Sequence, residues 1–253
     1  MAHAVSVPTQ TSVPAGSVVQ IDEPRYLGAR LAADTLLEDE TGTRFVLGDV
    51  LGKPVILVLS YYGCDGTCPT MNLELAAALS RMDRFQLGRD FRILTVSFDG
   101  RDTSGTATEF LRKTGLAPAQ GWRHAVLKSM DVKTFAGGVG FNYFWSDAAK
   151  SFMHPNVLVF LTPEGRVARY IYGTRMDAQN IELALIDADW NRISNSTALF
   201  DMLTGACFSY NYAEGKYQVN YSLVAGIGSL ILGITLLGLG SWAYRRKMGR
   251  VHE

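Results

Sequence analysis

Two segments of strand-like sequence stand out in the first half of the chain. Residues 55–61 form a continuous apolar run rich in β-branched residues, which is typical of a buried central strand. Residues 91–98 predict a second strand. Each is followed by apolar residues at helical spacing, which predict helices over 69–82 and 106–113. The order strand, helix, strand, helix is typical of an α/β domain.

The second half of the chain predicts a hairpin and a closing helix. Residues 156–161 and 167–172 predict two further strands, and Pro163-Glu164-Gly165 between them is a turn sequence. Helical spacing covers 129–136 before this hairpin and 175–188 after it. The complete pattern predicts a mixed sheet flanked by helices on both faces.

The ends of the chain differ from this central body, which we place at residues 25–190. Residues 1–24 are rich in Val, Ser, Thr and Pro and lack periodicity, which predicts an extended N-terminal tail. Residues 191–221 are irregular and rich in aromatic side chains. We expect this segment to lie next to a membrane and to pack on lipid headgroups or on a partner.

Residues 222–244 contain no charged side chain. A helix of this length spans a hydrocarbon core of about 30 Å, whereas a buried core helix would normally show a polar face. Four basic residues follow within the tail 245–253, namely Arg245, Arg246, Lys247 and Arg250. The positive-inside rule places that tail in the cytoplasm. The sequence therefore predicts a single-pass protein of the bacterial inner membrane, anchored in the lipid bilayer, with its body in the periplasm.

An exported body needs a signal, yet residues 1–21 contain no apolar stretch of the required length. Ala2-His3-Ala4 resembles the end of a cleavage site. We expect that the numbering begins near a processing site or at a start codon chosen too late.

The amino-acid composition excludes some classes of function for this body. The 24 Lys and Arg residues balance the 24 Asp and Glu residues. This balance argues against a nucleic-acid binder that works through a broad basic surface. Only 3 cysteines are present, which excludes a disulfide-dense scaffold. Cys207 stands alone, and we expect it to be a small buried side chain rather than a lipid-attachment site or an intermolecular thiol.

The other two cysteines, Cys64 and Cys68, lie between the first predicted strand and its helix. Ligands and reactive groups gather at this position in open α/β sheets, and a helix N-terminus favours the thiolate form of cysteine. Three residues separate the two sulfurs, one more than in a thioredoxin-type redox pair. The pair could close into a disulfide or hold one metal ion, and thiolates suit Cu(I).

A histidine would complete a three-coordinate copper site. The sequence has 4 histidines, and His3 and His252 lie in the two tails. His154 directly precedes the strand 156–161, where the entering loop is expected to face the cysteines. His124 lies in a predicted loop and is the weaker candidate.

These features together resemble the Sco/SenC family of copper chaperones, which are membrane-anchored proteins of the thioredoxin fold. The resemblance covers about residues 25–190. The matching segments are Gly52-Lys53-Pro54, Cys64-x-x-x-Cys68-Pro69, Thr95-Val96-Ser97-Phe98-Asp99, Arg101-Asp102-Thr103, Met153-His154 and Val157-Leu158-Val159-Phe160-Leu161-Thr162-Pro163-Glu164-Gly165. In that family two cysteines and one histidine bind copper and serve the dinuclear copper centre of cytochrome c oxidase.

The resemblance implies that Cys64, Cys68 and His154 bind copper, as Cu(I) or Cu(II), and that the partner is the copper-bearing subunit of the oxidase. It also implies a thioredoxin-like fold. Three departures stand out. The residue after the first cysteine is Asp65 rather than proline, and the family's Asp-Pro-x-Arg-Asp-Thr is shortened to Asp99-Gly100-Arg101-Asp102-Thr103. The predicted membrane helix is C-terminal, whereas the best-known members have an N-terminal one.

We therefore expect a copper-binding assembly factor rather than a turnover enzyme. One alternative is a thiol–disulfide oxidoreductase in which Cys64 attacks and Cys68 resolves. A second is an accessory subunit docked permanently in a respiratory complex. A stripe of small residues in the predicted membrane helix would serve such docking, namely Ala225, Ser229 and Gly233.

Overall fold

The computed structural model describes residues 20–64, 66–193, 208–211, 216–219, 225–226, 229–230 and 232–240. The chain divides into two compact units, Met1–Ser196 and Thr197–Glu253. Predictions for the tail 1–19, for Asp65 and Cys207, and for the basic tail 245–253 lie outside the described residues.

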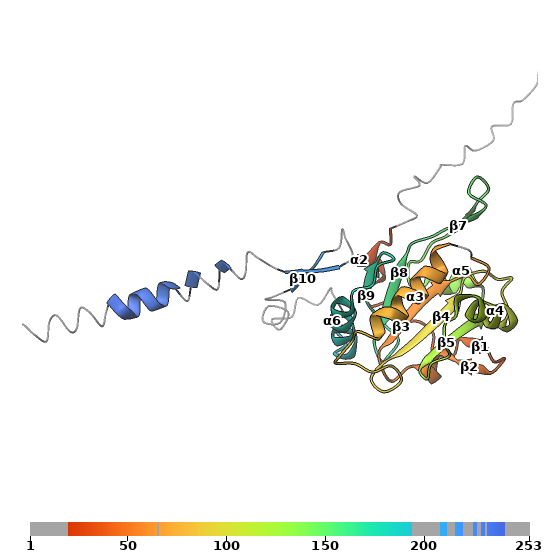
Figure 1. Cartoon of the computed structure of the whole chain (residues 1–253), viewed down its shortest axis with the longest axis horizontal. Coiled ribbons are helices and arrows are strands. Elements are labelled where there is room, and N and C mark those ends of the chain that lie inside the picture. Colours follow the sequence, from red (N-terminus) through yellow and green to blue (C-terminus); the bar gives the residue numbers. More distant parts are fainter. Residues whose placement is uncertain are drawn as a thin grey trace, which may run out of the picture. The chain divides into compact units, whose positions relative to one another are not determined.

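A seven-stranded mixed sheet forms the centre of the first unit (Figure 1). Its strands follow the order β2-β1-β5-β4-β3-β8-β9. Neighbours β3, β4 and β5 are parallel, and all other neighbouring pairs are antiparallel. The strands are β1 (Leu36–Asp39), β2 (Arg44–Val46), β3 (Val55–Ser60), β4 (Arg92–Ser97), β5 (Trp122–Leu127), β8 (Val157–Leu161) and β9 (Val167–Tyr172).

Helices cover the sheet, and its central strands are therefore buried along their whole length. All six residues of β3 are buried. Helices α3 and α4 both link parallel strands and contact each other, as right-handed crossovers in the same direction require. Phe135 of α5 belongs to the same buried core cluster as Leu57 and Leu59 of β3. The helices are α2 (Glu23–Tyr26), α3 (Thr67–Leu79), α4 (Ser104–Thr114), α5 (Val132–Gly137) and α6 (Ala178–Asp189), with a 3₁₀ turn η1 at Leu47–Val50.

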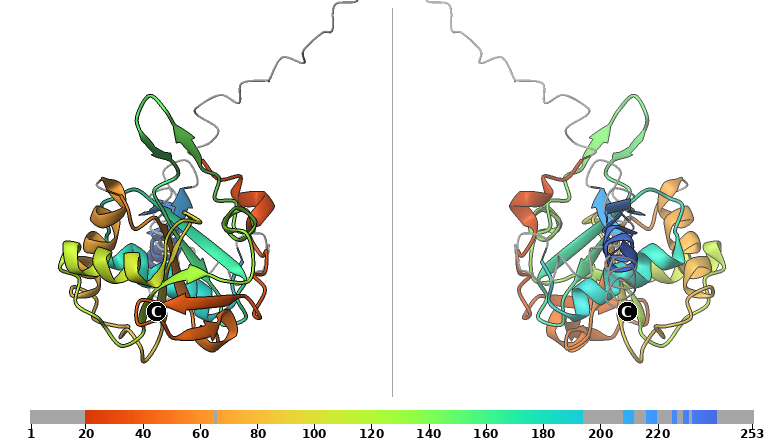
Figure 2. Two further views of the ribbon diagram at one scale, coloured as in Figure 1. Left: turned by 90° about the vertical axis from the view of Figure 1, so that its right-hand side faces the viewer. Right: turned by 90° about the vertical axis from the view of Figure 1, so that its left-hand side faces the viewer.

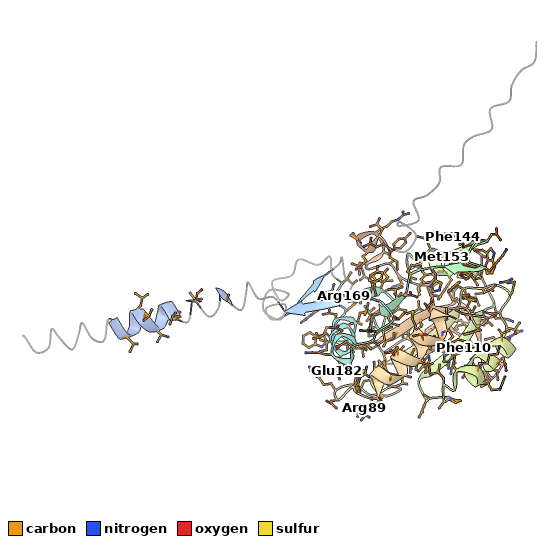
Figure 3. The ribbon with its side chains drawn as sticks, turned by 45° about the horizontal axis from the view of Figure 1, so that its top comes forward. Arg89, Phe110, Phe144, Met153, Arg169 and Glu182 are labelled. Carbon is orange, nitrogen blue, oxygen red and sulfur yellow. The ribbon has the colours of Figure 1, made fainter. Side chains whose placement is uncertain are left out.

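A small hairpin stands out from this body (Figure 2). It consists of β6 (Phe144–Ser146) and β7 (Ser151–Met153), which pair antiparallel. Phe144 and Trp145 are exposed large side chains on β6, and Met153 is another on β7; Figure 3 labels Phe144 and Met153. Because β7 is followed directly by His154 and β8, this hairpin sets the position of the predicted histidine ligand.

The predicted strands and helices of the body are all confirmed, with ends shifted by a few residues. One assignment is wrong: His124 lies in strand β5, not in a loop. It is buried and stacks on Trp122, with ring centroids 5.4 Å apart. The folded body also begins earlier than expected, since Ile21 and Glu23 are already buried ahead of Arg25.

The second unit contains a two-stranded hairpin within the aromatic segment. Strands β10 (Phe208–Asn211) and β11 (Lys216–Val219) pair antiparallel. Residues 225–226, 229–230 and 232–240 are helical, and the rest of the predicted membrane segment 222–244 lies outside the described residues. Within the described part of the chain, no helix has the length and apolar character needed to cross a membrane.

Candidate metal centre

The cysteine loop directly follows strand β3, at the carboxyl end of this central strand. The strand ends at Ser60 and α3 begins at Thr67, two residues before the predicted start. Cys68 therefore lies in the first turn of the helix, where its side chain is only 1% exposed. Cys64 is half-buried in the loop, and both thiols are free. The outer, accessible sulfur is thus that of Cys64, and the inner one that of Cys68.

The imidazole of His154 lies next to the inner sulfur. Its Nε2 atom is 3.7 Å from Cys68 Sγ, although the two residues are 86 positions apart in the chain. Its Nδ1 atom is 3.0 Å from the carbonyl oxygen of Pro155. Because a carbonyl oxygen can only accept, Nδ1 carries the ring proton and Nε2 presents its lone pair toward the cysteines. Such a backbone hydrogen bond is a usual way of orienting a metal-binding histidine.

Aromatic packing holds this imidazole in place. The His154 ring lies against Phe98 and Phe141, with centroid distances of 5.1 and 5.8 Å. Phe98 is 1% exposed and also contacts Tyr61 beside the cysteine loop at 5.5 Å and Phe152 of β7 at 5.6 Å. One buried ring therefore connects the cysteine loop, the hairpin and the histidine.

The two thiols have opposite electrostatic environments. The pKa of Cys64 is lowered to about 5, chiefly by its interaction with the Cys68 thiol; burial opposes this shift, and the backbone N–H groups of Cys68 and Gly66 add to it. The Gly66 N–H lies 3.3 Å from Cys64 Sγ. The pKa of Cys68 is raised far above its usual value by its interaction with Cys64 and by burial. In the reduced, metal-free protein at neutral pH, Cys64 is a thiolate and Cys68 a thiol.

We expect alkylation of Cys64 by iodoacetamide to proceed at a nearly constant rate from pH 8 down to about pH 6. The rate should reach half its maximum near the Cys64 pKa of about 5, because only the thiolate reacts. Mass spectrometry of quenched samples resolves the cysteine-containing peptides. In Cys68→Ala the side chain that lowers the Cys64 pKa most is lost, so the midpoint should rise. A wild-type midpoint near the ordinary value of about 8.5 would contradict the charge assignment.

The separation of the inner pair fits a shared metal ion. For a d¹⁰ ion such as Zn²⁺, metal–sulfur and metal–nitrogen bonds of about 2.3 and 2.0 Å at a trigonal angle place the two ligand atoms about 3.7 Å apart. The distance of 3.7 Å between Cys68 Sγ and His154 Nε2 matches this value. Across the described residues, however, no three His, Cys, Asp or Glu side chains already surround one point. Cys64 is thus the ligand that has to turn toward the other two, and the three-residue ligand set stays a prediction.

The site opens into a cleft of about 550 Å³ between the cysteine loop and the β6–β7 hairpin. It is lined by Tyr61, Cys64, Lys150, Phe152, Met153 and His154, among others. A partner's side chain therefore has access to Cys64 and His154 from the same side.

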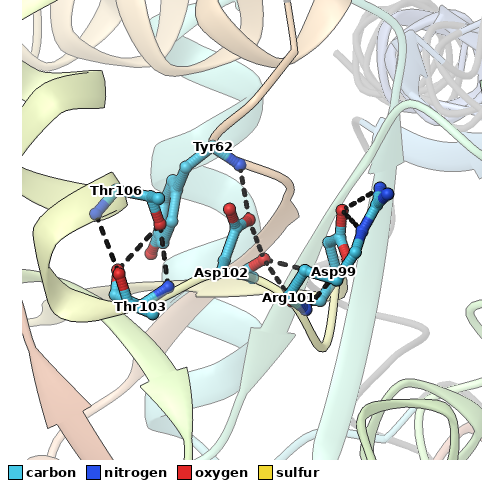
Figure 4. Close-up of polar contacts among 7 residues, drawn as sticks. Tyr62, Asp99, Arg101, Asp102, Thr103 and Thr106 are labelled. Atoms are coloured by element: carbon cyan, nitrogen blue, oxygen red, sulfur yellow. Dashed lines mark hydrogen bonds and ion pairs between the residues drawn. The ribbon is translucent and has the colours of Figure 1, made fainter.

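Asp102 fixes the start of the cysteine loop, a role that the sequence does not reveal (Figure 4). One oxygen of its carboxylate accepts hydrogen bonds from the Tyr62 N–H at 2.8 Å and from the Ser97 hydroxyl at 2.6 Å. The ends of β3 and β4 are thereby tied together two residues before Cys64. Asp99 instead pairs with the exposed Arg101, also drawn in Figure 4.

The fold and this site define a thioredoxin-like protein with a Cys-x-x-x-Cys pair and a facing histidine. The family model described as SCO1/SenC matches residues 26–185, and the chain therefore belongs to the SCO1/SenC family.

Several solved structures are similar to this chain. Two are proposed electron transfer and electron transport proteins from Aquifex aeolicus VF5. One is 29% identical, with a TM-score of 0.60 over 68% of this chain and 99% of that one. The other is 30% identical, with a TM-score of 0.57 over 65% and 99%. ScoI from Arabidopsis thaliana with copper bound has the same fold at 21% identity, with a TM-score of 0.50 over 62% of this chain and 98% of that one. No curated protein sequence matches the chain.

Proposed function

We propose that this protein is a copper chaperone for cytochrome c oxidase assembly, and that it binds copper through Cys64, Cys68 and His154. The observation that carries the proposal is the preformed pair of Cys68 Sγ and His154 Nε2, 3.7 Å apart beside the second thiol. A Sco protein of this fold has been solved with copper bound, and another, BsSco, belongs to a family of cytochrome c oxidase assembly proteins.

The three side chains have different roles in the binding and release of copper. Two thiolates and one imidazole form a soft ligand set for Cu(I). Cys64 is already ionised, whereas Cys68 must release its proton when it becomes a ligand. Cys64 is also the more accessible sulfur. Transfer to the copper-bearing subunit of the oxidase would therefore begin by replacement of Cys64 with a ligand from the partner.

Competition titration of the reduced protein with a Cu(I) chelator tests the proposal. Wild-type protein should bind one copper ion. Cys64→Ser should weaken binding by about 100-fold or more, since each ligand contributes several kcal/mol to a metal-binding free energy of about 10–16 kcal/mol, the range of structural zinc sites. Cys207→Ser is the matched control, because it removes the third cysteine of the chain. Full copper affinity in Cys64→Ser would reject this ligand set.

Disulfide exchange is a second candidate function, favoured by the ionised, accessible Cys64. Its thiolate would attack a partner's disulfide and form a mixed disulfide, releasing one partner thiolate. Cys68, after losing its proton, would then displace the second one. The partner leaves as a dithiol, and this chain keeps a Cys64–Cys68 disulfide. Reduction of a small disulfide by the metal-free protein measures this activity directly.

We also propose that residues 222–244 anchor the protein in the bacterial inner membrane, with the body in the periplasm. The support is the uncharged sequence, followed by Arg245 and its basic neighbours. In the described helical part, large apolar side chains are exposed, including Leu232, Ile234 and Leu237. Carbonate extraction of native membranes should leave the full chain in the pellet, and protease should reach the body only after the outer membrane is opened. Docking in a respiratory complex through this helix stays a prediction.

A further inference from the structure

The β6–β7 hairpin carries most of the exposed large apolar side chains of the body. Among the described residues 20–193, these side chains are Leu73, Phe144, Trp145, Met153 and Trp190. Phe144 is 43%, Trp145 44% and Met153 38% exposed on the hairpin. Phe144 and Met153 are partners in the register of the two strands (Figure 3), so they form one exposed apolar pair on the same face. Exposed apolar side chains that gather in one place mark an interaction surface, whereas single ones are normal.

The other face of the hairpin fixes it to the cysteine loop. Phe152 is the register partner of Trp145, and the two rings pack with centroids 5.2 Å apart. The ring of Phe152 also lies 5.1 Å from that of Tyr61 and 5.6 Å from that of Phe98. The indole N–H of Trp145 donates to Asp147 Oδ1 at 3.2 Å. Side chains that are already held in place lose little conformational entropy when a partner binds. The hairpin is therefore a pre-organised contact surface.

The hairpin also forms one wall of the metal cleft. Phe152, Met153 and His154 line the cleft from this side, and Tyr61 and Cys64 line it from the cysteine loop. Metal–ligand bonds measure about 2.0–2.3 Å, so a ligand that replaces Cys64 has to enter the cleft. A protein that supplies such a ligand therefore has to cover the hairpin wall.

The tip of the hairpin argues against a lipid bilayer as the occupant of this surface. Asp147 and Lys150 lie at the tip with side chains that are 89% and 76% exposed, and charged side chains enter hydrocarbon only at a high cost. A second copy of the chain is disfavoured for another reason. A contact between two hairpins would cover both clefts and keep an acceptor away from the metal. The apolar pair and its position beside the cleft fit a protein that receives the metal.

We propose that the β6–β7 hairpin is the docking surface for the protein that accepts copper, and that Phe144 and Trp145 are its apolar anchors. The partner carries an apolar patch next to its soft metal ligands, since aromatic residues and methionine are enriched in the buried centre of protein interfaces. The proposal deepens the proposed function, because it rests on the transfer of copper from Cys64 and His154 to a partner.

The test is the association of the full-length protein in detergent with the soluble copper-bearing domain of the oxidase subunit, measured by biolayer interferometry. Both the metal-free and the Cu(I)-loaded protein are used. Loss of an aromatic anchor from the centre of an interface weakens binding about tenfold or more. Phe144→Ser and Trp145→Ser should each weaken association by this factor in both states. The Cu(I) affinity of Phe144→Ser, measured by chelator competition, should equal that of the wild type, because Phe144 does not line the cleft.

Trp190→Ser is the matched control, since Trp190 is 59% exposed on the same body but lies outside the hairpin. Its association should equal that of the wild type. Unchanged association in Phe144→Ser and Trp145→Ser, or an equal loss in Trp190→Ser, would overturn the proposal. So would a wild-type protein that does not associate with the domain in either state.

Three further outcomes separate the docking surface from other roles of the hairpin. If Phe144→Ser weakened Cu(I) binding as much as association, the hairpin would act on His154 and the proposal would be wrong. It would also be wrong if Phe144→Ser abolished self-association or binding to phospholipid vesicles while association with the domain stayed unchanged. A wild-type protein that docks through the hairpin but binds no copper would count against the copper site and would support the docking surface.

Discussion

Replacing His154 by alanine is expected to weaken copper binding about 100- to 1,000-fold while leaving disulfide exchange within about threefold of the wild type. The magnitude is the contribution of one ligand to a metal-binding free energy of about 10–16 kcal/mol, the range of structural zinc sites. The selectivity follows from the structure, because the groups that lower the pKa of Cys64 most are the Cys68 thiol, backbone N–H groups and Tyr61. Chelator competition and reduction of a small disulfide, measured on the same preparation, separate the two activities.

His124→Phe is the control for this experiment. It also removes an imidazole, but in strand β5, where the ring stacks on Trp122 at 5.4 Å and packs near Phe110 at 6.1 Å. Both activities should be unchanged. If His154→Ala retained wild-type copper affinity, the ligand set would be wrong. If it lost disulfide exchange as well, the histidine would be needed to hold the cysteine loop rather than to bind metal.

The sequence predicts the strands that lie deepest in the molecule, because burial on both faces produces an uninterrupted apolar run. Strand β3 is such a case. Strand β1 is missed because buried and partly exposed positions alternate along only four residues, Leu36–Asp39. Strand β5 is missed because Arg123 and His124 interrupt its apolar run. In the structure the backbone N–H of His124 donates to Glu40, and its ring is covered by aromatic neighbours. This histidine is a core residue because of tertiary packing, which a local sequence pattern cannot predict.

The candidate site is predictable only in part. Spacing identifies Cys64 and Cys68, and a place before a core strand identifies His154. The supporting groups could not be found in this way, because Ser60, Asn72 and Thr95 are ordinary residues in their own segments. They become linked by side-chain hydrogen bonds only when the fold joins positions that lie 12 to 27 residues apart. Asp102 similarly meets Tyr62 across 40 residues.

The second large effect is expected at Phe98. Truncation to alanine should destabilise the protein by about 3–5 kcal/mol, the usual cost of removing a buried phenylalanine. The ring is 1% exposed and lies 4.7 Å from the ring of Tyr143 and 5.2 Å from that of Phe141. Urea unfolding followed by circular dichroism gives the change in the free energy of unfolding.

Phe98→Ala should also affect the metal site, because the same ring packs against the imidazole of His154 at 5.1 Å. Loss of a group that orients a ligand typically costs about 10- to 100-fold in metal affinity, and we expect this loss in protein that is still folded at low temperature. Phe98→Leu is the matched variant: it refills much of the volume and should recover most of the stability, but it offers the imidazole no aromatic face. If Phe98→Leu restored stability and copper affinity together, filled volume alone would hold His154. If it restored stability while affinity stayed low, the aromatic ring itself would set the direction of the ligand.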